Sequence, residues 1–306
     1  MPAVSVVIPA YRAEAYIERP VRSLLGQTLP DWEAVIVADD DADYAACLRE
    51  RGIVDARIRH ASTGCMGSGA ARARNAGLDA AGSRIVATLD SDDALAERAL
   101  EILVPAAATH GAAYSSIQLL DHVTGERLAC RDRALPSGLI GLEQIFTSHI
   151  HTYAGVVVDR SRVRARWPGW MKRWEDVYFF ASCFDDVGAM YHAEEPLYLY
   201  YRREGSICNR TETMAEYLAW ADDVARRIAS GDEIGLRETS VRVTFGRLLR
   251  SRYLIESVFR DDLADGRCVD FQDFIGRRQD LFYSLDAPGT CTASIASSTR
   301  SWSGEP

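Results

Sequence analysis

Short apolar runs alternate with segments of helical character through the first 120 residues, and this rhythm constrains the fold more than any other feature of the chain. The apolar runs have strand length and are continuous, as strands buried on both faces of a sheet are. They lie at residues 4–11, 33–39, 56–62, 84–90 and 112–120. The helical segments between them lie at residues 14–28, 42–52, 69–82 and 95–111. This order predicts an α/β fold with a mostly parallel central sheet and helices on both faces.

Acidic residues follow two of these predicted strands. The fourth run ends in Asp90, and Asp92 and Asp93 come directly after it, while residues 39–41 are three aspartates at the end of the second run. Carboxylates that share a poorly solvated site need a cation, or one of them takes up a proton. Ligands of such sheets bind outside the carboxyl ends of the strands, which favours a metal site. Asp93 has an alternative role as the cap of a helix that begins near Leu95.

Composition excludes several classes of protein. The chain has 306 residues, of which 47% are hydrophobic and 26% charged, as in an ordinary globular protein. The net charge of -9 argues against a nucleic-acid binder, which would carry a basic surplus. No apolar run approaches the roughly 20 residues of a membrane span, and the opening run is interpreted as a strand rather than a signal peptide. Seven cysteines without a CxxC pair argue against a zinc site or a disulfide framework and predict a cytoplasmic protein.

The pattern loosens after residue 120. Residues 121–129 predict a hairpin, and residues 153–160 predict a further strand. A tryptophan-rich loop runs into a helix within residues 167–188. Residues 189–208 predict two short strands around a turn at Pro196.

The C-terminal part is mostly helical in character from 212 to 285, and the tail from 287 to 306 has no core-forming pattern and is expected to be disordered. Residues 237–259 place apolar side chains on one face of a helix that also carries five arginines. A basic amphipathic helix can lie on an anionic membrane. The sequence leaves three alternatives open for it: peripheral membrane contact, packing on the rest of the chain, or a homodimer contact.

Four segments carry a set of motifs in a fixed order. Residues 4–28 are a strand and a helix, and residues 32–42 are a strand that ends in acids. Residues 67–95 are an Ala-Arg-Asn helix followed by a strand that ends in Asp-Ser-Asp-Asp. Residues 173–207 are a Glu-Asp helix with Tyr-Arg-Arg-Glu-Gly-Ser beyond it. Together they resemble the family 2 glycosyltransferases, inverting enzymes of the GT-A (Rossmann-like) fold that use nucleotide-activated sugars. The chain departs from the family pattern at Arg12, usually Asn, and at residues 38–41, so the acid that meets the base stays open.

The resemblance implies a donor site at the acid clusters. Asp39 would accept a hydrogen bond from a uracil base, Asp90 would face the ribose or the metal, and Asp92 would be the main metal ligand. Hard oxygen ligands suit Mn²⁺ or Mg²⁺, which would bridge the diphosphate and stabilise the leaving group. The other expected donor contacts are Pro9, Ala10, Tyr11, Glu14, Asp40, Gly69, Arg74, Asn75, Ser91, Arg202 and Arg203.

The resemblance also implies the catalytic base. Inversion requires a group that takes the proton of the acceptor hydroxyl. The Glu-Asp motif makes Asp176 the favoured base and Glu175 the alternative, although acids at a helix start also stabilise the helix dipole. Trp170 and Trp174 are expected to stack on the acceptor sugar, or else to pack in the core.

The expected function is therefore metal-dependent inverting transfer of a sugar from a nucleotide-diphosphate donor, expected to be a UDP-sugar, to a saccharide or lipid-linked acceptor in polysaccharide, glycan or glycolipid synthesis. Two alternatives stay open: a non-catalytic nucleotide-sugar-binding subunit and a nucleotidyltransferase. The expected catalytic domain spans residues 1–207, with a donor half to residue 119 and an acceptor half from residue 120. A helical region at 208–286 would follow, and a membrane contact would be peripheral, at the inner face.

Overall fold

The computed structural model describes most of the first 203 residues and part of the remainder. The described residues are 1–131, 135–147, 154–171, 174–203, 223–224, 226–227, 235–269, 273–274 and 277. The chain divides into two compact units. The first consists of residues 1–203 together with 233–245, and the second of residues 204–232 together with 246–306.

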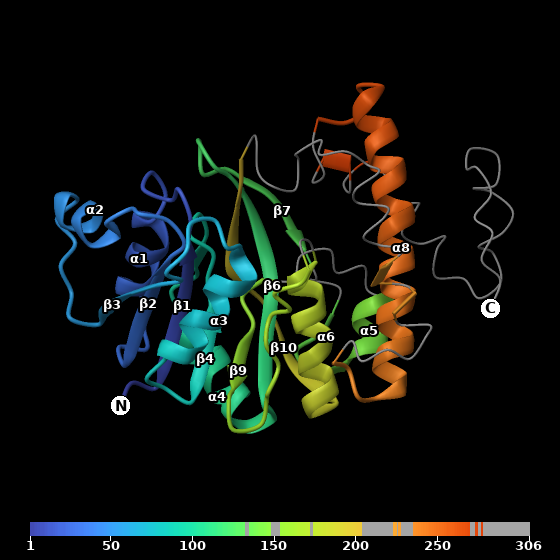
Figure 1. Cartoon of the computed structure of the whole chain (residues 1–306), viewed down its shortest axis with the longest axis horizontal. Helices are drawn as coiled ribbons and strands as arrows, with labels where there is room; N and C mark the ends of the chain where they lie inside the picture. The colour runs from blue at the N-terminus through green and yellow to red at the C-terminus, as the bar shows by residue number, and fades with distance from the viewer. Residues whose placement is uncertain are drawn as a thin grey trace, which may run out of the picture. The chain divides into compact units, whose positions relative to one another are not determined.

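The elements of the first 121 residues follow the predicted β-α order (Figure 1). They are β1 (Val4–Ala10), α1 (Glu18–Leu25), β2 (Trp32–Ala38), α2 (Tyr44–Glu50), β3 (Ile58–Ser62), α3 (Ala70–Ala80), β4 (Ile85–Thr88), β5 (Ala94–Leu95), α4 (Ala99–His110) and β6 (Ala112–Asp121). The predicted α/β fold is confirmed.

The chain beyond residue 121 adds strands to the same sheet. Its elements are β7 (Arg127–Arg131), β8 (Gly138–Gly141), α5 (Leu142–Thr147), β9 (Val157–Asp159), α6 (Glu175–Val187) and β10 (Ala189–Arg202). The strand order is β3-β2-β1-β4-β9-β6-β10-β5, with β7 paired to β6 and β8 to β10. The strands β3, β2, β1 and β4 are parallel, as is the β6–β10 pair, whereas β9 is antiparallel to both of its neighbours. The antiparallel β6–β7 pair is the predicted hairpin.

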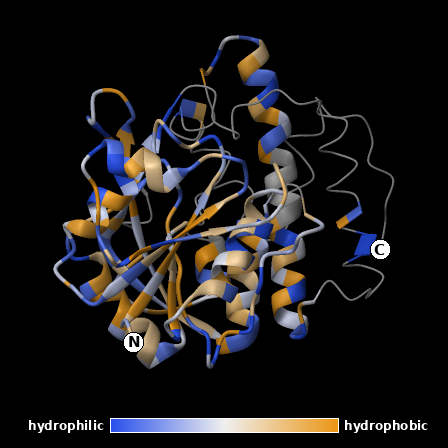
Figure 2. Ribbon diagram, turned by 60° about the vertical axis from the view of Figure 1, so that its left-hand side comes forward, coloured by the Kyte–Doolittle hydropathy of each residue, from blue (hydrophilic) through white to orange (hydrophobic). Residues whose placement is uncertain are grey.

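Different helices cover the two faces of the sheet. Val4, Val6 and Ile8 of β1 lie in one core cluster with side chains of α1, α2 and α4. Val7 faces the other side and packs on α3 at Gly77, where an added Cβ would lie 2.2 Å from Val7 Cγ1. The strands at the centre of Figure 2 accordingly carry mostly hydrophobic residues. Both faces are therefore buried, which explains the continuous apolar runs.

Helix α1 is shorter than predicted. The helix expected from residue 14 begins at Glu18, and turns precede it, in which Tyr16 N and Ile17 N both donate to the Ala13 carbonyl. This start places Pro20 in the first helical turn. A proline is tolerated there because the N–H that it lacks would have no helical partner.

The prediction of a helix beginning near Leu95 is wrong. Ala94–Leu95 form β5, antiparallel to β10, and α4 begins at Ala99. Asp93 is therefore not a helix cap. Its carboxylate is buried and accepts hydrogen bonds from Tyr198 Oη and Tyr201 N, both at 2.8 Å. Contacts with a strand about a hundred positions away decide the local structure here.

The prediction of two strands around Pro196 is also wrong. β10 is one continuous strand along β6, with register shifts between Ala193 and Pro196 and between Pro196 and Tyr198. A proline has no N–H to offer to a ladder, and an irregularity of the register accommodates it.

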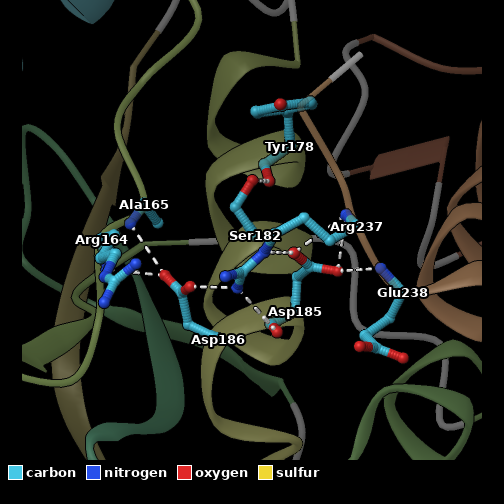
Figure 3. Close-up of polar contacts among 8 residues, drawn as sticks. All are labelled: Arg164, Ala165, Tyr178, Ser182, Asp185, Asp186, Arg237 and Glu238. Atoms are coloured by element: carbon cyan, nitrogen blue, oxygen red, sulfur yellow. Dashed lines mark hydrogen bonds and ion pairs between the residues drawn. The ribbon is translucent and has the colours of Figure 1, made fainter. Parts of the chain in front are cut away.

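Two buried acids near the C-terminal end of α6 hold a segment of the C-terminal region (Figure 3). Asp185 accepts hydrogen bonds from Arg237 N at 3.0 Å and from Glu238 N at 2.7 Å. The Arg237 side chain donates to Asp185 at 2.9 Å and to Asp186 at 2.5 Å. A cavity of about 400 Å³ lies at this end of α6, with Ser182 in its wall.

The predicted helical region is described in part. Helix α8 (Thr239–Ala264) begins in the first unit, where Phe245 meets Tyr178 edge-on at 5.7 Å between ring centroids. In the second unit, Ile255, Phe259, Cys268 and Phe274 form a separate apolar cluster. The predicted tail from 287 lies outside the described residues. Among the residues that are described, no helix combines the length and apolarity needed to cross a bilayer.

Candidate active site

Three segments that carry acids or aromatic residues lie at the carboxyl ends of neighbouring parallel strands. β1 has β2 on one side and β4 on the other, and all three strands are parallel. Their carboxyl ends therefore lie side by side. Residues 9–12, 39–41 and 90–93 lie at or just beyond these ends, so the tertiary structure gathers most of the predicted donor residues at one edge of the sheet.

Asp39 holds the loop that leads into α3. Its buried carboxylate accepts hydrogen bonds from Thr63 Oγ1 at 2.7 Å, from Gly69 N at 2.8 Å, and from Ser68 Oγ. Burial opposes ionisation of Asp39, but the hydrogen bonds from Ser68, Thr63 and Gly69 outweigh it and hold its pKa below the ordinary value. Gly69, with φ of 100°, begins α3 in a conformation that favours glycine. The contact between Asp39 and a base stays a prediction.

Asp40 shapes the turn after β1. It accepts hydrogen bonds from Arg12 N at 2.5 Å and from Tyr44 Oη at 2.9 Å. Arg12 has φ of 50°, a left-handed conformation that a non-glycine residue adopts only when its surroundings impose it. Tyr11 remains 45% exposed and its ring lies against Gly67. The turn thus presents an aromatic ring near the carboxyl ends of the parallel strands.

Arg74 joins the two halves of the site. Its side chain is only 12% exposed and donates to Asp90 Oδ1 at 2.8 Å and to Glu175 Oε1 at 3.2 Å. Burial works against its charge, but Asp90, Glu175 and Asp176 outweigh burial and raise the pKa of Arg74. The predicted contact of Arg74 with a donor stays a prediction; in this arrangement both terminal nitrogens are held by acids.

Two arginines hold Asp92. Arg203 Nε donates to Asp92 Oδ2 at 2.9 Å, and Arg19 Nη1 donates to the Asp92 carbonyl at 2.5 Å. Burial works against the charge of Arg203, but the interaction with Asp92 outweighs it and raises the pKa of Arg203. Arg202 is the last residue of β10, and its carbonyl accepts a hydrogen bond from His122 N. The side chain of Arg203, one of the two predicted arginines, thus reaches the acid cluster.

Asp93 is the third acid of the cluster. Burial and the charges of Asp92 and Asp90 raise the pKa of Asp93 well above its ordinary value. The repulsion among the three acids is thus reduced by their arginine partners and by the raised pKa of Asp93, which favours the protonated carboxyl group.

The predicted base lies at the start of α6. Glu175 and Asp176 occupy the first turn, where the positive end of the helix dipole stabilises carboxylates. Asp176 Oδ1 accepts a hydrogen bond from Val177 N at 2.8 Å. Trp174 precedes them with φ of 60°, so both non-glycine residues with positive φ in the described chain, Trp174 and Arg12, adjoin predicted site residues. Strain of this kind is typical of functional sites.

The tryptophan loop is fixed by Asn75. Its amide donates to the Trp167 carbonyl at 2.7 Å and accepts from Trp167 N at 3.0 Å. Trp167 is buried and stacks on Phe179. Asn75 thus acts on this loop, and its predicted donor contact stays a prediction. Trp170 is 45% exposed and meets Tyr178 edge-on, which leaves much of its ring accessible for the predicted acceptor contact.

Asp90 and Asp92 have the chemistry for a divalent cation. Their side chains are 33% and 26% exposed and offer hard oxygen ligands. Among the described residues no group of three or more His, Cys, Asp or Glu surrounds a metal position. The two carboxylates therefore fit a metal only if diphosphate and water complete its ligands, as is common for Mg²⁺. The other predicted donor residues at this edge are Pro9 and Ala10 at the end of β1, the exposed Glu14, and the partly buried Ser91.

Comparison with known proteins adds the family. The model of the family described as "Glycosyl transferase family 2" matches residues 5–161. The chain belongs to glycosyl transferase family 2. This membership confirms the family resemblance of the sequence motifs. The matched region includes Asp39, Asp90 and Asp92, whereas Glu175 and Asp176 lie beyond it.

Two curated relatives resemble part of this family 2 chain. The putative teichuronic acid biosynthesis glycosyltransferase TuaG of Bacillus subtilis (strain 168) is 46% identical over 93 residues, covering 30% of this chain and 36% of TuaG. The UDP-Glc:alpha-D-GlcNAc-diphosphoundecaprenol beta-1,3-glucosyltransferase WfgD of Escherichia coli is 38% identical over 101 residues, covering 33% of this chain and 39% of WfgD. The matches thus span little more than a third of the length of these relatives.

A solved structure shares the fold. S. aureus TarS 1–349 in complex with UDP-GlcNAc superposes with a TM-score of 0.63 at 18% identity, over 82% of this chain and 71% of TarS 1–349. At this identity the likeness establishes the fold of the family 2 chain, in agreement with its sheet and helices.

Several residues of the site had no signal in the sequence. Arg19 lies in a helical turn, His122 in a hairpin, and Tyr198 and Tyr201 in an aromatic strand, and each pattern is typical of ordinary structure. All four contact Asp92, Asp93 or their partners.

Proposed function

We propose that the chain is an inverting glycosyltransferase that moves a sugar from a UDP-sugar to an acceptor hydroxyl. The observation that carries the proposal is the ion-paired bridge from Asp90 through Arg74 to Glu175, which links the acids at the strand ends to the start of α6. A donor held at the strand ends would present its anomeric carbon toward the first turn of α6.

Each residue has a part in this reaction. Asp39 and Tyr11 bind the base, Asp90 the ribose, and Arg203 exchanges its contact with Asp92 for the donor diphosphate. A Mn²⁺ or Mg²⁺ ion at Asp92 and Asp90 would neutralise the diphosphate as it leaves. Asp176 takes the proton of the acceptor hydroxyl while the acceptor oxygen bonds to the anomeric carbon and the bond to the diphosphate breaks.

The charge pattern suits Asp176 as the base. The helix N-terminus stabilises its carboxylate, and its neighbour Glu175 is engaged by Arg74. Glu175 is the alternative base, and Arg74 binds its carboxylate. Trp170 and Trp174 would orient the acceptor sugar by stacking.

The donor and acceptor classes rest on the relatives. WfgD is named for a UDP-glucose donor and a diphosphoundecaprenol acceptor, and the TarS structure holds UDP-GlcNAc. They support a UDP-sugar and a saccharide or lipid-linked saccharide acceptor, in polysaccharide, glycan or glycolipid biosynthesis. The proposed catalytic region is residues 1–207, and α8 would provide a peripheral membrane contact at the cytoplasmic face or a homodimer contact.

The test is ligand-dependent stability. Thermal unfolding is followed with UDP, GDP, CDP and their sugars, with and without Mn²⁺, for the wild type, Asp92→Ala and Asp31→Ala. A ligand at about 100 times its Kd adds about 2.7 kcal/mol, so UDP with Mn²⁺ should stabilise the wild type visibly. Asp92→Ala should lose this response, and the control Asp31→Ala, which changes an exposed acid just before β2, should keep it.

A transfer assay separates the alternatives. Asp176→Asn should abolish turnover without weakening UDP binding. A wild type that binds UDP-sugars but transfers nothing to any saccharide or lipid-linked acceptor would favour a non-catalytic binding subunit. Release of pyrophosphate from a sugar phosphate and UTP would favour a nucleotidyltransferase.

A further inference from the structure

Arg19 makes an unusual set of contacts for a residue in the first turn of α1. Its Nη1 donates to the Asp92 carbonyl at 2.5 Å and lies 3.0 Å from His122 Nδ1, and its Nη2 donates to the His122 carbonyl at 3.4 Å. Its guanidinium lies over the ring of Tyr201, 3.8 Å from the ring centroid. The Arg19 guanidinium is thus held by contacts at both terminal nitrogens and by the Tyr201 ring on one face.

The surroundings of Arg19 form a frame around Asp92. Tyr16 meets His122 edge-on at 5.3 Å, and Arg203 lies over the Tyr16 ring at 4.8 Å while it binds the Asp92 carboxylate. The frame draws on α1, the end of β6 and the end of β10. It therefore connects Asp92 to three separate parts of the fold.

The two arginines hold different atoms of Asp92, and this difference matters. Arg203 occupies a carboxylate oxygen, so a cation or a diphosphate at Asp92 has to compete with it. Arg19 occupies the main-chain carbonyl, which leaves the carboxylate available. Asp92 lies in a turn between β4 and β5, where no strand ladder fixes its peptide. A contact with its carbonyl is therefore an effective means of fixing the direction of its side chain.

We propose that Arg19 is a positioning residue that orients Asp92 for metal-dependent binding of the donor diphosphate. This inference rests on the proposed function. Arg19 remains on the Asp92 carbonyl when Arg203 is displaced from the carboxylate, and the stacked Tyr201 and the His122 contacts keep its guanidinium in place. Replacing a residue that hydrogen-bonds to a metal ligand typically lowers metal affinity by 10- to 100-fold.

The experiment is calorimetric titration of UDP into the full chain with and without Mn²⁺. The variant is Arg19→Met, which keeps the length of the side chain and removes its donors. The matched control is Arg22→Met on the same helix, where Arg22 pairs with Glu18 at the surface. We expect Arg19→Met to weaken UDP binding in Mn²⁺ about tenfold, to leave metal-free UDP binding unchanged, and Arg22→Met to match the wild type.

The metal-free titration separates positioning from a general structural role. A folded Arg19→Met variant with wild-type affinity in Mn²⁺, or with equal losses in both titrations, overturns the inference while the proposed function stands. A wild type that binds no UDP in Mn²⁺ overturns both. Should Arg19→Met fail to fold, Arg19→Lys decides, because lysine keeps the charge but not the planar fork. We expect a smaller, Mn²⁺-specific loss for it, and unchanged affinity overturns the inference.

Discussion

Arg74 donates to Glu175 across 101 positions of sequence, at 3.2 Å, while its other terminal nitrogen holds Asp90 at 2.8 Å. This pairing joins α3 to the first turn of α6. The charge balance of one half of the site therefore depends on the other half.

Replacement of Arg74 by methionine should leave two acids without their partner. Loss of one member of a buried ion pair costs several kcal/mol, and we expect about 2 kcal/mol here because Asp90 and Glu175 stay partly exposed. Urea denaturation measures the loss, with Arg72→Met, an exposed arginine of the same helix, as the control. Equal stability of the two variants would contradict a structural role for the bridge.

Asp39→Asn should loosen the loop that leads into α3. An amide cannot accept all the hydrogen bonds that Asp39 takes from Thr63, Ser68 and Gly69, and we expect a loss of about 1 to 2 kcal/mol. Because the pKa of Asp39 is lowered, the stabilisation by its carboxylate is present above the unfolded-state value near pH 4 and is lost as the pH falls through the folded-state pKa. The difference between wild type and variant in urea denaturation should therefore narrow on acidification, and a constant difference down to about pH 3 would contradict this account.

The buried His192 predicts a loss of stability in mild acid. Burial lowers its pKa despite the Pro136 carbonyl and Glu194, and its ring also contacts Ser116 Oγ at 3.3 Å. His192 takes up a proton below about pH 6.5 in the unfolded chain but only at a lower pH in the folded chain. Its contribution to the free energy of unfolding is therefore fully present above about pH 6.5 and is lost as the pH falls below that value. One histidine contributes at most about 1.4 kcal/mol per pH unit.

The measurement for His192 is the unfolding free energy between about pH 7.5 and 5. His192→Gln should show a shallower dependence than the wild type. The pKa of His60 is lowered as well, so His60→Gln serves to assign part of the remaining slope. Identical slopes for the wild type and His192→Gln would refute the assignment.

Gly77→Ala should disturb the contact of α3 with the sheet. The added methyl group would lie 2.2 Å from Val7 Cγ1, and overpacking of this kind typically costs about 1 to 3 kcal/mol. The second change Val7→Ala should recover part of the loss, because it removes the clashing methyl groups. Thermal unfolding of the single and double variants measures this coupling, with Gly141→Ala as a control whose added Cβ meets only ordinary contacts. Additive losses without recovery would mean that α3 lies elsewhere.

Much of the fold could be predicted from the chain because both faces of its sheet are buried. Continuous apolar runs such as residues 4–11 and 33–39 have few other uses in a globular protein, and their order with helices limits the topology. The order of motifs likewise identified the family. These signals are local or repetitive, so they can be recognised in the sequence without knowledge of any tertiary contact.

The partners of the acids were decided only by the tertiary structure. Asp93 could cap a helix as far as its neighbours in sequence show, but Tyr198 and Tyr201 of β10 bury it and exclude that role. Arg19 carries no motif, yet the approach of α1 to the turn after β4 places it on Asp92. Hydrogen bonds and ion pairs depend on angles and on distances of a few ångströms. Such geometry arises between segments far apart in the chain, so the sequence by itself determined the strands and the acids at their ends, and packing determined what each acid binds.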